Sequence, residues 1–268
     1  MFMTLMEYFW RASQQIVMLT PNEPAEKADI EGWGSGFFLQ YRKRTFFVTC
    51  DHNLHMLDDY ANGERTGLDF GVAVITNTTN PNNPLSMGLV TISGFYYFES
   101  LDIRLPEIED LKDVAFAEIK APFPLPILTN RIVGMDGGVI VEEGLEKIII
   151  LEESLAEPAE RKDYVMTGCI RNKIVDGIRM DRQTTFRNGI RYKKDKTNLN
   201  SQLVFENPTT IIYDDWKGLS GSPFFDENGC LIGMVNEVVD DGFDIYVTPI
   251  KAITKLLDYA IMVENNQK

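Results

Sequence analysis

The sequence is poor in histidine and cysteine. Only two histidines and three cysteines occur in 268 residues. The cysteines, Cys50, Cys169 and Cys230, are odd in number and far apart, which argues against a disulfide framework and favours a reducing compartment. No C-x-x-C pair offers a thiolate scaffold for zinc, and we expect the protein to use no metal or other cofactor.

Positive charge is also scarce. The chain has 26 lysines and arginines against 40 aspartates and glutamates, which gives a formal net charge of −14. Because nucleic-acid binding depends on basic side chains that neutralise phosphates, this balance argues against a nucleic-acid partner. It also disfavours an anionic membrane surface and suits cationic peptides or proteins as partners. A solvated acidic surface that aids solubility explains most of the charge.

Long apolar runs are missing as well. No stretch reaches the roughly 18 apolar residues that a membrane-spanning helix requires. The N-terminal segment MFMTLMEYFWRASQQ is apolar but carries Glu7 and has no basic residue ahead of it, unlike a signal peptide. Its residues Phe2, Leu5, Met6 and Phe9 follow helical spacing, which predicts a short amphipathic helix. We therefore expect a cytoplasmic protein.

The chain does contain many short strand-like segments. They are rich in β-branched and aromatic residues and are bounded by Gly, Pro, Asn or Asp, as in barrels and sandwiches. A proline-dense stretch at residues 121–126 separates two groups of them, because proline fits neither a helix interior nor the middle of a sheet. In order, the segments are QQIVMLT, GFFLQY, TFFVTC, FGVAVIT, LVTISGFYYF and DVAFAEI, then GGVIV, KIIIL, DYVMTGCI, GIRM, TTIIY, CLIGMV and DIYVTPI.

The polar stretches and the C-terminus complete the predicted organisation. The acidic segment ESLAEPAERK and the basic segment RNGIRYKKDKTNLN are expected to form surface loops or an exposed hairpin. Beyond Pro249, one apolar stripe predicts a C-terminal helix, formed by Ile250, Ile253, Leu256, Leu257, Ala260 and Ile261. We expect residues 1–120 to hold the N-terminal helix and a first barrel, 121–129 a linker, 130–248 a second barrel, and 249–268 the C-terminal helix.

One segment presents a serine among glycines. Residues 216–235 read WKGLSGSPFFDENGCLIGMV, in which Ser220 precedes a strand–turn–strand pattern. A serine hydroxyl is a weak nucleophile at neutral pH and needs a base, and histidine has a suitable pKa. If Ser220 is a nucleophile, its base is therefore His52 or His55. Both histidines precede the serine, which is the wrong order for an α/β-hydrolase.

Two other interpretations stay open at this point. Gly-Ser turns before strands are common, so the segment around Ser220 can be a tight turn and nothing more. The second concerns His52 and His55, which can be metal ligands together with Asp51 or Asp58. Against a metal site, the histidines follow a strand and no third clustered ligand is evident.

Three motifs, in this order, resemble those of the trypsin-like serine peptidases. FFVTCDH at residues 46–52 resembles the histidine motif of that family, and DVAFAEI at residues 113–119 resembles its aspartate motif. GLSGSP at residues 218–223 resembles its nucleophile motif, Gly-Asp-Ser-Gly-Gly-Pro. GSGFFL at residues 34–39 is similar to the strand before the histidine in bacterial intracellular trypsin-like domains. The resemblance covers roughly residues 14–264, by pattern more than by identity.

This resemblance implies a fold and an activity. The fold is all-β, with two six-stranded antiparallel Greek-key β-barrels (chymotrypsin-like), a short N-terminal helix and a C-terminal helix. The activity is that of a serine endopeptidase, in which Ser220 attacks a peptide carbonyl, His52 takes its proton and Asp113 orients the imidazole. Asp102 and Asp110 are weaker rivals of Asp113, because no comparable apolar run follows either.

The same resemblance assigns an oxyanion hole to Gly218, Leu219 and Ser220, whose first and last backbone N–H groups would meet the developing anion. Two residues here depart from the family pattern. Leu219 replaces the usual aspartate, so we expect no maturation by a newly cleaved N-terminus. Ser222 replaces a glycine, which is a mild change.

Substrate binding is assigned to four residues. Asp214, six residues before the nucleophile, falls where an acid at the base of the specificity pocket selects lysine or arginine, and Asp215 is the alternative if the loop is shifted by one. Asn236 falls where a serine usually supports the triad aspartate, and Glu237 is expected near the pocket mouth. The resemblance thus implies a preference for basic residues at the cleavage site.

Two further functions remain candidates. A catalytically silent relative would keep the fold and use its cleft to bind a peptide. A regulated peptidase in a signalling or defence system would need an activating protein partner to order its loops. The complete set of His52, Asp113, Ser220 and Gly218 favours the active peptidase.

Overall fold

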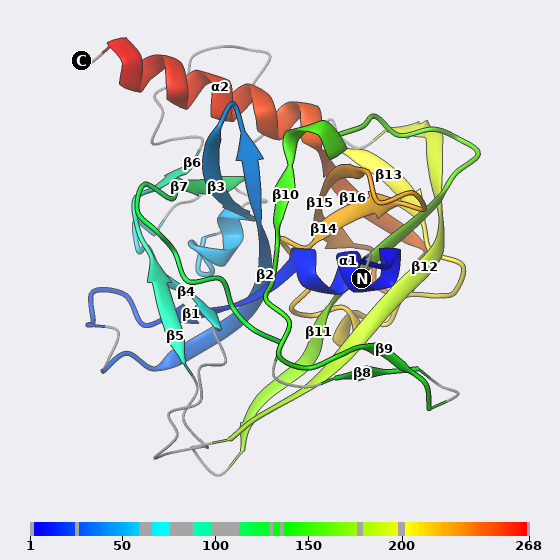
Figure 1. Ribbon diagram of the computed structural model, residues 1–268, viewed down its shortest axis with the longest axis horizontal. Helices are drawn as coiled ribbons and strands as arrows, with labels where there is room; N and C mark the ends of the chain where they lie inside the picture. The colour runs from blue at the N-terminus through cyan, green and yellow to red at the C-terminus, as the bar shows by residue number, and fades with distance from the viewer. Residues whose placement is uncertain are drawn as a thin grey trace.

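The computed structural model of the protein describes residues 3–24, 27–58, 66–75, 88–97, 113–128, 131–134, 137–175, 179–197 and 202–266. Within them the chain forms two antiparallel β structures that lie side by side, with one helix near each end of the chain (Figure 1). The expected all-β architecture is therefore confirmed.

The first half of the chain forms an antiparallel sheet. Its strands are β1 (Ser13–Leu19), β2 (Ile30–Tyr41), β3 (Arg44–Thr49), β4 (Gly71–Ile75), β5 (Leu89–Ile92), β6 (Phe95–Tyr97) and β7 (Ala115–Glu118). They pair in the order β5–β4–β1–β2–β3–β7–β6. The two outermost strands, β5 and β6, are separated in sequence only by Ser93 and Gly94, so the chain itself joins the two edges into a barrel. Gly94 has a φ of +73°, a conformation that glycine adopts without strain.

The second half forms a barrel closed by hydrogen bonds. Its strands are β11 (Asp163–Val175), β12 (Arg179–Thr197), β13 (Leu203–Glu206), β14 (Pro223–Asp226), β15 (Leu231–Val238) and β16 (Asp244–Pro249). The ring runs β11–β12–β13–β16–β15–β14, and β14 pairs back onto β11 with Val165 opposite Phe225.

Both barrels share one strand order. If β5 and β6 are counted as two parts of one strand, each barrel follows the order 1–2–3–6–5–4 in sequence numbering. Such a Greek-key order repeated in two barrels is the arrangement expected for the chymotrypsin-like fold, which the structure therefore adopts.

The two helices pack where the barrels meet. Helix α1 (Leu5–Ala12) begins after Thr4, whose hydroxyl accepts from the Glu7 backbone N–H at 3.1 Å, as in a standard N-cap. Helix α2 (Ile250–Asn266) follows β16 directly and runs across the top of the molecule (Figure 1). One buried cluster joins side chains of both helices and both barrels, including Phe9, Phe116, Phe225 and Leu256. The barrels are thus locked together by apolar packing.

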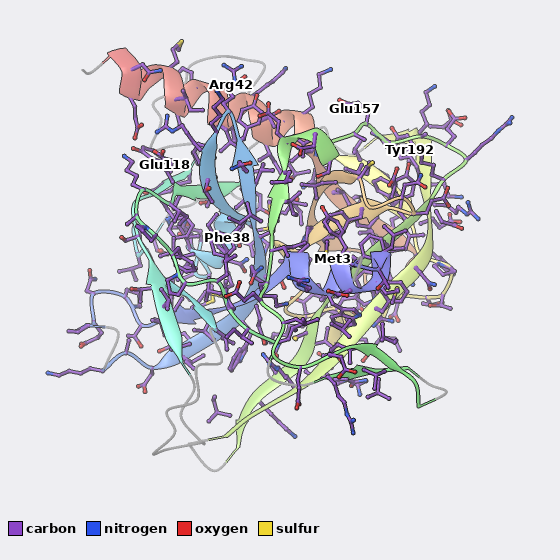
Figure 2. All side chains as sticks on the ribbon, viewed as in Figure 1. Met3, Phe38, Arg42, Glu118, Glu157 and Tyr192 are labelled. Atoms are coloured by element: carbon purple, nitrogen blue, oxygen red, sulfur yellow. The ribbon has the colours of Figure 1, made fainter. Side chains whose placement is uncertain are left out.

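The β2–β3 hairpin reaches up to helix α2. Arg42 and Lys43 at its tip have φ values of +48° and +63°, the pattern of a type I′ turn, which matches the twist of hairpin strands. The Arg42 guanidinium lies beside α2 and pairs with Asp258 at 2.8 Å (Figure 2). This contact connects the first barrel to a helix that follows the second.

Short elements fill the connections. They are the 3-10 turns η1 (Asp51–Asn53), η4 (Glu152–Ser154) and η5 (Tyr213–Asp215), the paired strands β8 (Ile132–Val133) and β9 (Val139–Val141), and β10 (Ile149–Leu151). Strand β10 pairs in parallel with β2 of the first barrel, although residue 149 lies in the range predicted for the second. The domain boundaries at residues 120, 129 and 248 stay a prediction.

One local prediction was wrong, and a second was only partly right. The segment TTIIY forms no strand, because Ile211 alone is buried there and the chain then turns into η5; the strand in this region is the earlier LVFE segment, β13. The basic segment beginning at Arg187 was expected to be a loop or hairpin, but most of it belongs to β12. Its lysines lie on this strand, where Lys193 pairs with Glu206 at 2.9 Å.

Candidate active site

A cleft of about 740 Å³ is lined by both barrels. The first barrel contributes His52 and Asp113, and the second contributes Gly218, Ser220 and Asn236. Residues that are far apart in the sequence therefore face one enclosed space. This juxtaposition joins the two halves of the predicted site.

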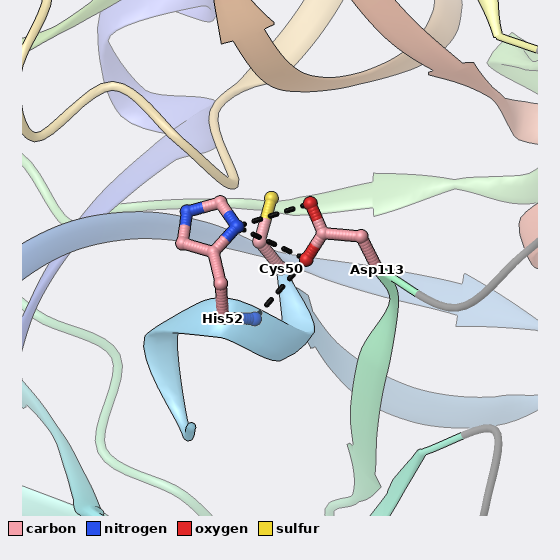
Figure 3. Close-up of side chains that lie close together, drawn as sticks. All are labelled: Cys50, His52 and Asp113. Atoms are coloured by element: carbon pink, nitrogen blue, oxygen red, sulfur yellow. Dashed lines mark hydrogen bonds and ion pairs between the residues drawn. The ribbon is translucent and has the colours of Figure 1, made fainter. Parts of the chain in front are cut away.

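The ends of two neighbouring strands bring His52 to Asp113. Strands β3 and β7 pair with Thr49 opposite Ala115, so the chain leaves β3 into η1 next to the point where it enters β7. His52 Nδ1 lies 3.0 Å from each carboxylate oxygen of Asp113, and the His52 backbone N–H donates to the same carboxylate at 3.1 Å (Figure 3). The carboxylate thus fixes both the ring and the turn that carries it.

The charges of this pair support each other. Burial lowers the pKa of the His52 imidazole, but the negative charges of Asp113, Asp51 and Glu237 outweigh that effect, and the pKa lies above its ordinary value. Burial also raises the pKa of the Asp113 carboxyl, but His52 and a hydrogen bond from Asn236 outweigh it and hold that pKa below its ordinary value. Asp113 is therefore a carboxylate at neutral pH.

Asn236 holds the far side of the Asp113 carboxylate. Its side-chain amide donates to Asp113 Oδ2 at 2.7 Å and to the Asp113 backbone carbonyl at 3.0 Å. The amide oxygen of Asn236 accepts in turn from the backbone N–H of Thr248 at 3.1 Å, which fixes the orientation of the amide. The predicted role of residue 236 as a support for Asp113 agrees with these contacts.

The loop that carries Ser220 packs tightly on the first barrel. The Ser220 carbonyl accepts from the Ser35 backbone N–H at 2.9 Å and from the Asn53 amide at 3.2 Å. Gly221 has a φ of +91°, and a Cβ there would lie 2.0 Å from the Ser35 carbonyl oxygen. Only glycine allows this close approach, so the small residues around Ser220 are required by the contact between barrels.

Two backbone N–H groups of this loop are free. Among the residues that the structure describes, none accepts a hydrogen bond from the N–H of Gly218 or of Ser220. Gly218 has a φ of +101°, and its carbonyl is held instead by the Ser35 hydroxyl at 2.7 Å. The N–H of Leu219, the residue between Gly218 and Ser220, was not expected to meet the anion, and it donates to the Trp216 carbonyl at 3.0 Å. Its side chain is buried in the second barrel.

The hydroxyl of Ser220 does not engage the histidine in this conformation. Ser220 Oγ donates to the backbone carbonyl of Asn236 at 3.1 Å, and no hydrogen bond joins it to the His52 ring. Both side chains line the same cleft, and an engaged pair requires the Ser220 hydroxyl to leave the Asn236 carbonyl.

The two acids predicted at the base of a specificity pocket do not line the cleft. Asp214 is exposed on η5, and Asp215 forms an ion pair with Arg171, with Nε at 3.0 Å from Oδ1. Glu237, by contrast, lines the cleft as predicted.

The sequence analysis predicted no role in substrate binding for several lining residues, and it considered Asp58 only as a metal ligand. Glu31 and Trp33 of β2 and Asp58 after η1 also face the cleft. Asn53 is a fourth, and it stands directly after His52 in the motif that identified the histidine. Their side chains come together only through the barrel fold, and no local pattern marks them.

The second histidine belongs to a separate network. His55 is buried and lies 2.8 Å from Asp51 and 2.9 Å from Asp69, through opposite ring nitrogens. Both ring nitrogens of His55 are therefore engaged by carboxylates, which argues against the alternative metal site that uses both histidines. Within the described residues, one group has metal-ligand spacing, namely the ligand atoms of Cys50, His52 and Asp113, which lie within 4.8 Å of one another (Figure 3).

That group is better explained by its own hydrogen bonds. The Cys50 thiol is fully buried and donates to the Val235 carbonyl at 3.3 Å. Burial raises the pKa of this thiol well above its ordinary value, and the Asp113 charge raises it further. The contacts of these three side chains are thus hydrogen bonds within the protein: Cys50 to Val235, and His52 to Asp113.

Comparisons with known proteins add a few distant likenesses. No protein-family model and no curated protein matches the sequence. Among solved structures, the inactive form of the Rv3671c protease is 14% identical, with a TM-score of 0.44 over 95% of this chain and 91% of that chain. Human heparin binding protein is 12% identical, with a TM-score of 0.47 over 95% and 92%. The active form of the Rv3671c protease from M. tuberculosis is 14% identical, with a TM-score of 0.44 over 96% and 84%.

Over the part of the chain that the structure describes, no helix has the length and apolar character to cross a bilayer.

Proposed function

We propose that the protein is a serine endopeptidase that hydrolyses peptide bonds in the cleft between its two barrels. The observation that carries this proposal is the contact of His52 Nδ1 with both carboxylate oxygens of Asp113, in a cleft that Ser220 also lines. An imidazole oriented in this way presents its other nitrogen to the cleft as a base.

The proposed reaction begins at Ser220. His52 Nε2 takes the hydroxyl proton as Ser220 Oγ attacks the carbonyl carbon, and the Asp113 carboxylate stabilises the imidazolium that forms. The carbonyl oxygen becomes an oxyanion, for which the free N–H groups of Gly218 and Ser220 are donors. His52 then protonates the leaving amine, the acyl–serine ester remains, and water activated by the same imidazole hydrolyses that ester.

A preference for cationic substrates is part of this proposal, although on different residues from those predicted. Asp214 and Asp215 do not line the cleft, but Glu31, Asp58 and Glu237 do. Carboxylates that surround a partly enclosed space attract positively charged peptides. Basic residues near the cleaved bond are therefore favoured by the cleft as a whole, not by one acid at the base of a pocket.

One observation favours a second candidate, a peptidase that needs an activating partner or a silent relative that only binds peptides. The Ser220 hydroxyl donates to the Asn236 carbonyl and leaves the His52 ring without a contact to the serine. A partner or substrate that changes this rotamer would complete the site. The silent relative would keep the observed rotamer and bind a peptide without cleaving it.

Covalent labelling with a fluorophosphonate probe tests the proposal. The probe reacts with a serine only when a base and an oxyanion hole activate it. We expect the purified protein to be labelled at Ser220, and the Ser220→Ala and His52→Ala variants to stay unlabelled while their thermal unfolding remains unchanged.

The matched control is His55→Gln, which removes the other histidine and leaves the cleft intact. Labelling of this variant should continue at the parent rate. Absence of labelling in the parent protein alone, and again in the presence of cell extract, would refute the peptidase and leave the silent binding module. Labelling that requires the extract would identify the partner-dependent form.

A further inference from the structure

A second cavity, of about 270 Å³, lies where α1 and β1 meet β11 and β12. We call it the cationic cavity; its polar lining includes Gln15, Ser35, Arg131, Lys147, Cys169 and Arg182. It shares none of its lining residues with the cleft that holds Ser220. The proposed peptidase chemistry makes no use of this cavity.

Three cations face the cavity without a carboxylate partner. In the described parts of the chain, no acidic side chain pairs with Arg131, Lys147 or Arg182. The Lys147 ammonium donates only to the carbonyls of Trp10 and Ser13, at 2.7 and 2.6 Å. Arg182 donates to the neutral side-chain oxygen of Gln15.

Burial makes the charge of Lys147 costly to maintain. Burial lowers the pKa of Lys147 to about 8, and the positive charges of Arg182 and Arg11 add to that effect. The ammonium is still mostly protonated at neutral pH, and a buried charge without a counter-ion is destabilising. An anion in the cavity would relieve this penalty.

The rest of the lining is apolar and partly unsatisfied. Trp10, Leu128 and Ile132 form one wall and belong to a single buried cluster. The Trp10 ring nitrogen and the Gln14 side-chain oxygen are both buried and have no hydrogen-bond partner among the described residues. A ligand for this cavity therefore combines a charged head with an apolar body.

We propose that the cationic cavity binds a small organic anion, in which a phosphate or carboxylate head meets Lys147, Arg182 and Arg131 and an apolar group packs on Trp10. The bidentate geometry of arginine and the point charge of lysine suit both head groups.

The cavity is also connected to the Ser220 loop. The Ser35 side chain lines the cavity, and its hydroxyl donates to the Gly218 carbonyl at 2.7 Å. Gly168, another lining residue, lies against Leu219, because a Cβ at position 168 would be 2.4 Å from the Leu219 side chain. A bound anion would therefore restrain the loop that carries the free N–H groups. This consequence rests on the proposed function, whereas binding itself does not.

Binding is measured first, with phenyl phosphate and benzoate as anionic probes and benzyl alcohol as the neutral control. Because Trp10 lines the cavity, we expect both anions to change the tryptophan fluorescence and raise the unfolding temperature, and benzyl alcohol to do neither. The Trp10→Phe variant should lose the fluorescence change. Equal effects of benzyl alcohol and phenyl phosphate would overturn the proposal.

Two charge-removing variants locate the probe. Lys147→Met and Arg182→Met should each weaken binding of phenyl phosphate by roughly tenfold or more, as expected for the loss of a charged hydrogen bond. Lys251→Met removes an exposed cation on α2 and should leave binding unchanged. If one variant fails to fold, the other still tests the site. Unchanged binding in a folded Lys147→Met or Arg182→Met protein contradicts the proposal.

The connection to the loop is measured by the rate of fluorophosphonate labelling with and without phenyl phosphate. We expect a faster rate with the anion in the parent protein and no change in Lys147→Met. A protein that binds phenyl phosphate but is never labelled would keep the anion site and refute the peptidase. If the protein is labelled at the same rate with and without bound phenyl phosphate, only the connection between the cationic cavity and the Ser220 loop is refuted.

Discussion

At the scale of single residues, the site depends on how each charge is held by its neighbours. Asp113 receives the His52 ring on one side and the Asn236 amide on the other. His55 shows the same principle without a nucleophile nearby, since Asp51 and Asp69 occupy its two nitrogens. The two histidines therefore have different hydrogen-bonded carboxylates, although the charge of Asp51 raises the pKa of both.

This separation predicts a simple titration. Both imidazoles should have pKa values above the ordinary value of about 6.5, because in each case the carboxylates outweigh burial. Asp113→Asn should lower the pKa of His52 alone, and Asp69→Asn that of His55 alone. Since the protein has only two histidines, nuclear magnetic resonance of the imidazole protons resolves both. A shift of both histidines in either variant would contradict the separation.

The resemblance to the trypsin-like motifs singled out His52, Asp113, Ser220 and Asn236, and the structure brings all four to one cleft. The sequence could not place Asp214, because the direction of a side chain on a short turn depends on the turn itself. In the structure, η5 turns that acid into solvent.

At the scale of elements, the glycines around Ser220 are explained by the approach of one barrel to the other. Gly221 sits against the Ser35 carbonyl, and the loop carries a chain of hydrogen bonds back to β2 and η1. The motif that suggested catalysis is therefore also a packing requirement, so its presence alone does not establish activity.

Gly221→Ala tests the packing requirement. The new Cβ would lie 2.0 Å from the Ser35 carbonyl oxygen in a residue with φ of +91°, so the loop must move. We expect a loss of stability of about 3 kcal/mol or more. Gly144→Ala is the matched control, since that residue has a φ of +81° with nothing within 4 Å, and should cost only about 1 kcal/mol. Chemical unfolding measures the free energy of unfolding of both variants. Equal losses of stability would show that the positive φ alone, and not the contact with Ser35, requires glycine at position 221.

The elements themselves were partly predictable. The run LVTISGFYYF was expected as one strand, and it does close the first barrel, but Gly94 divides its described part into β5 and β6. The segment TTIIY has the composition of a strand and is not one, whereas LVFE is a strand that its short length concealed. Composition reports whether a segment can pair, but the partner strands decide whether it does.

At the scale of the whole molecule, helix α2 holds the first barrel although it follows the second in sequence. The Arg44 guanidinium pairs with Glu118 of β7 and with Glu264 of α2, and Lys120 lies 2.8 Å from Glu264. Hydrogen bonds from Lys120 and Arg44 lower the pKa of Glu264 to about 2. Together with the Arg42–Asp258 pair, these contacts attach the C-terminal helix to the first barrel.

Glu264→Gln should therefore weaken the protein in a pH-dependent way. A carboxylate whose pKa falls from 4.5 to about 2 on folding stabilises the protein above pH 4.5, and that contribution is lost as the pH falls toward 2. The variant should be less stable than the parent at pH 7, by on the order of 1 kcal/mol, and the difference should shrink below pH 4.5. Glu160→Gln, which removes an exposed pair with Lys194, should change little. Denaturant unfolding at several pH values measures both, and a constant difference would contradict the assignment.

The charge of the whole molecule acts on the cleft as well. The net charge of the protein is −14. The residues that line the cleft include the acids Glu31, Asp58 and Glu237 and one lysine, Lys217. Charges on the surface are screened over about 10 Å at 0.1 M salt, so attraction of a cationic peptide should weaken as salt increases. This attraction does not depend on catalysis, and it is best measured on Ser220→Ala, which cannot cleave the peptide.

We expect an arginine-rich peptide to bind this variant several-fold more weakly when the salt is raised from about 0.05 M to about 0.5 M, and a neutral peptide of the same length to bind independently of salt. Replacing Glu237 by glutamine should reduce the salt dependence, because it removes one of the carboxylates that line the cleft. Fluorescence anisotropy of labelled peptides gives both affinities. A salt-independent affinity for the cationic peptide would mean that contacts other than charge select the substrate, and that the acidic surface serves only solubility.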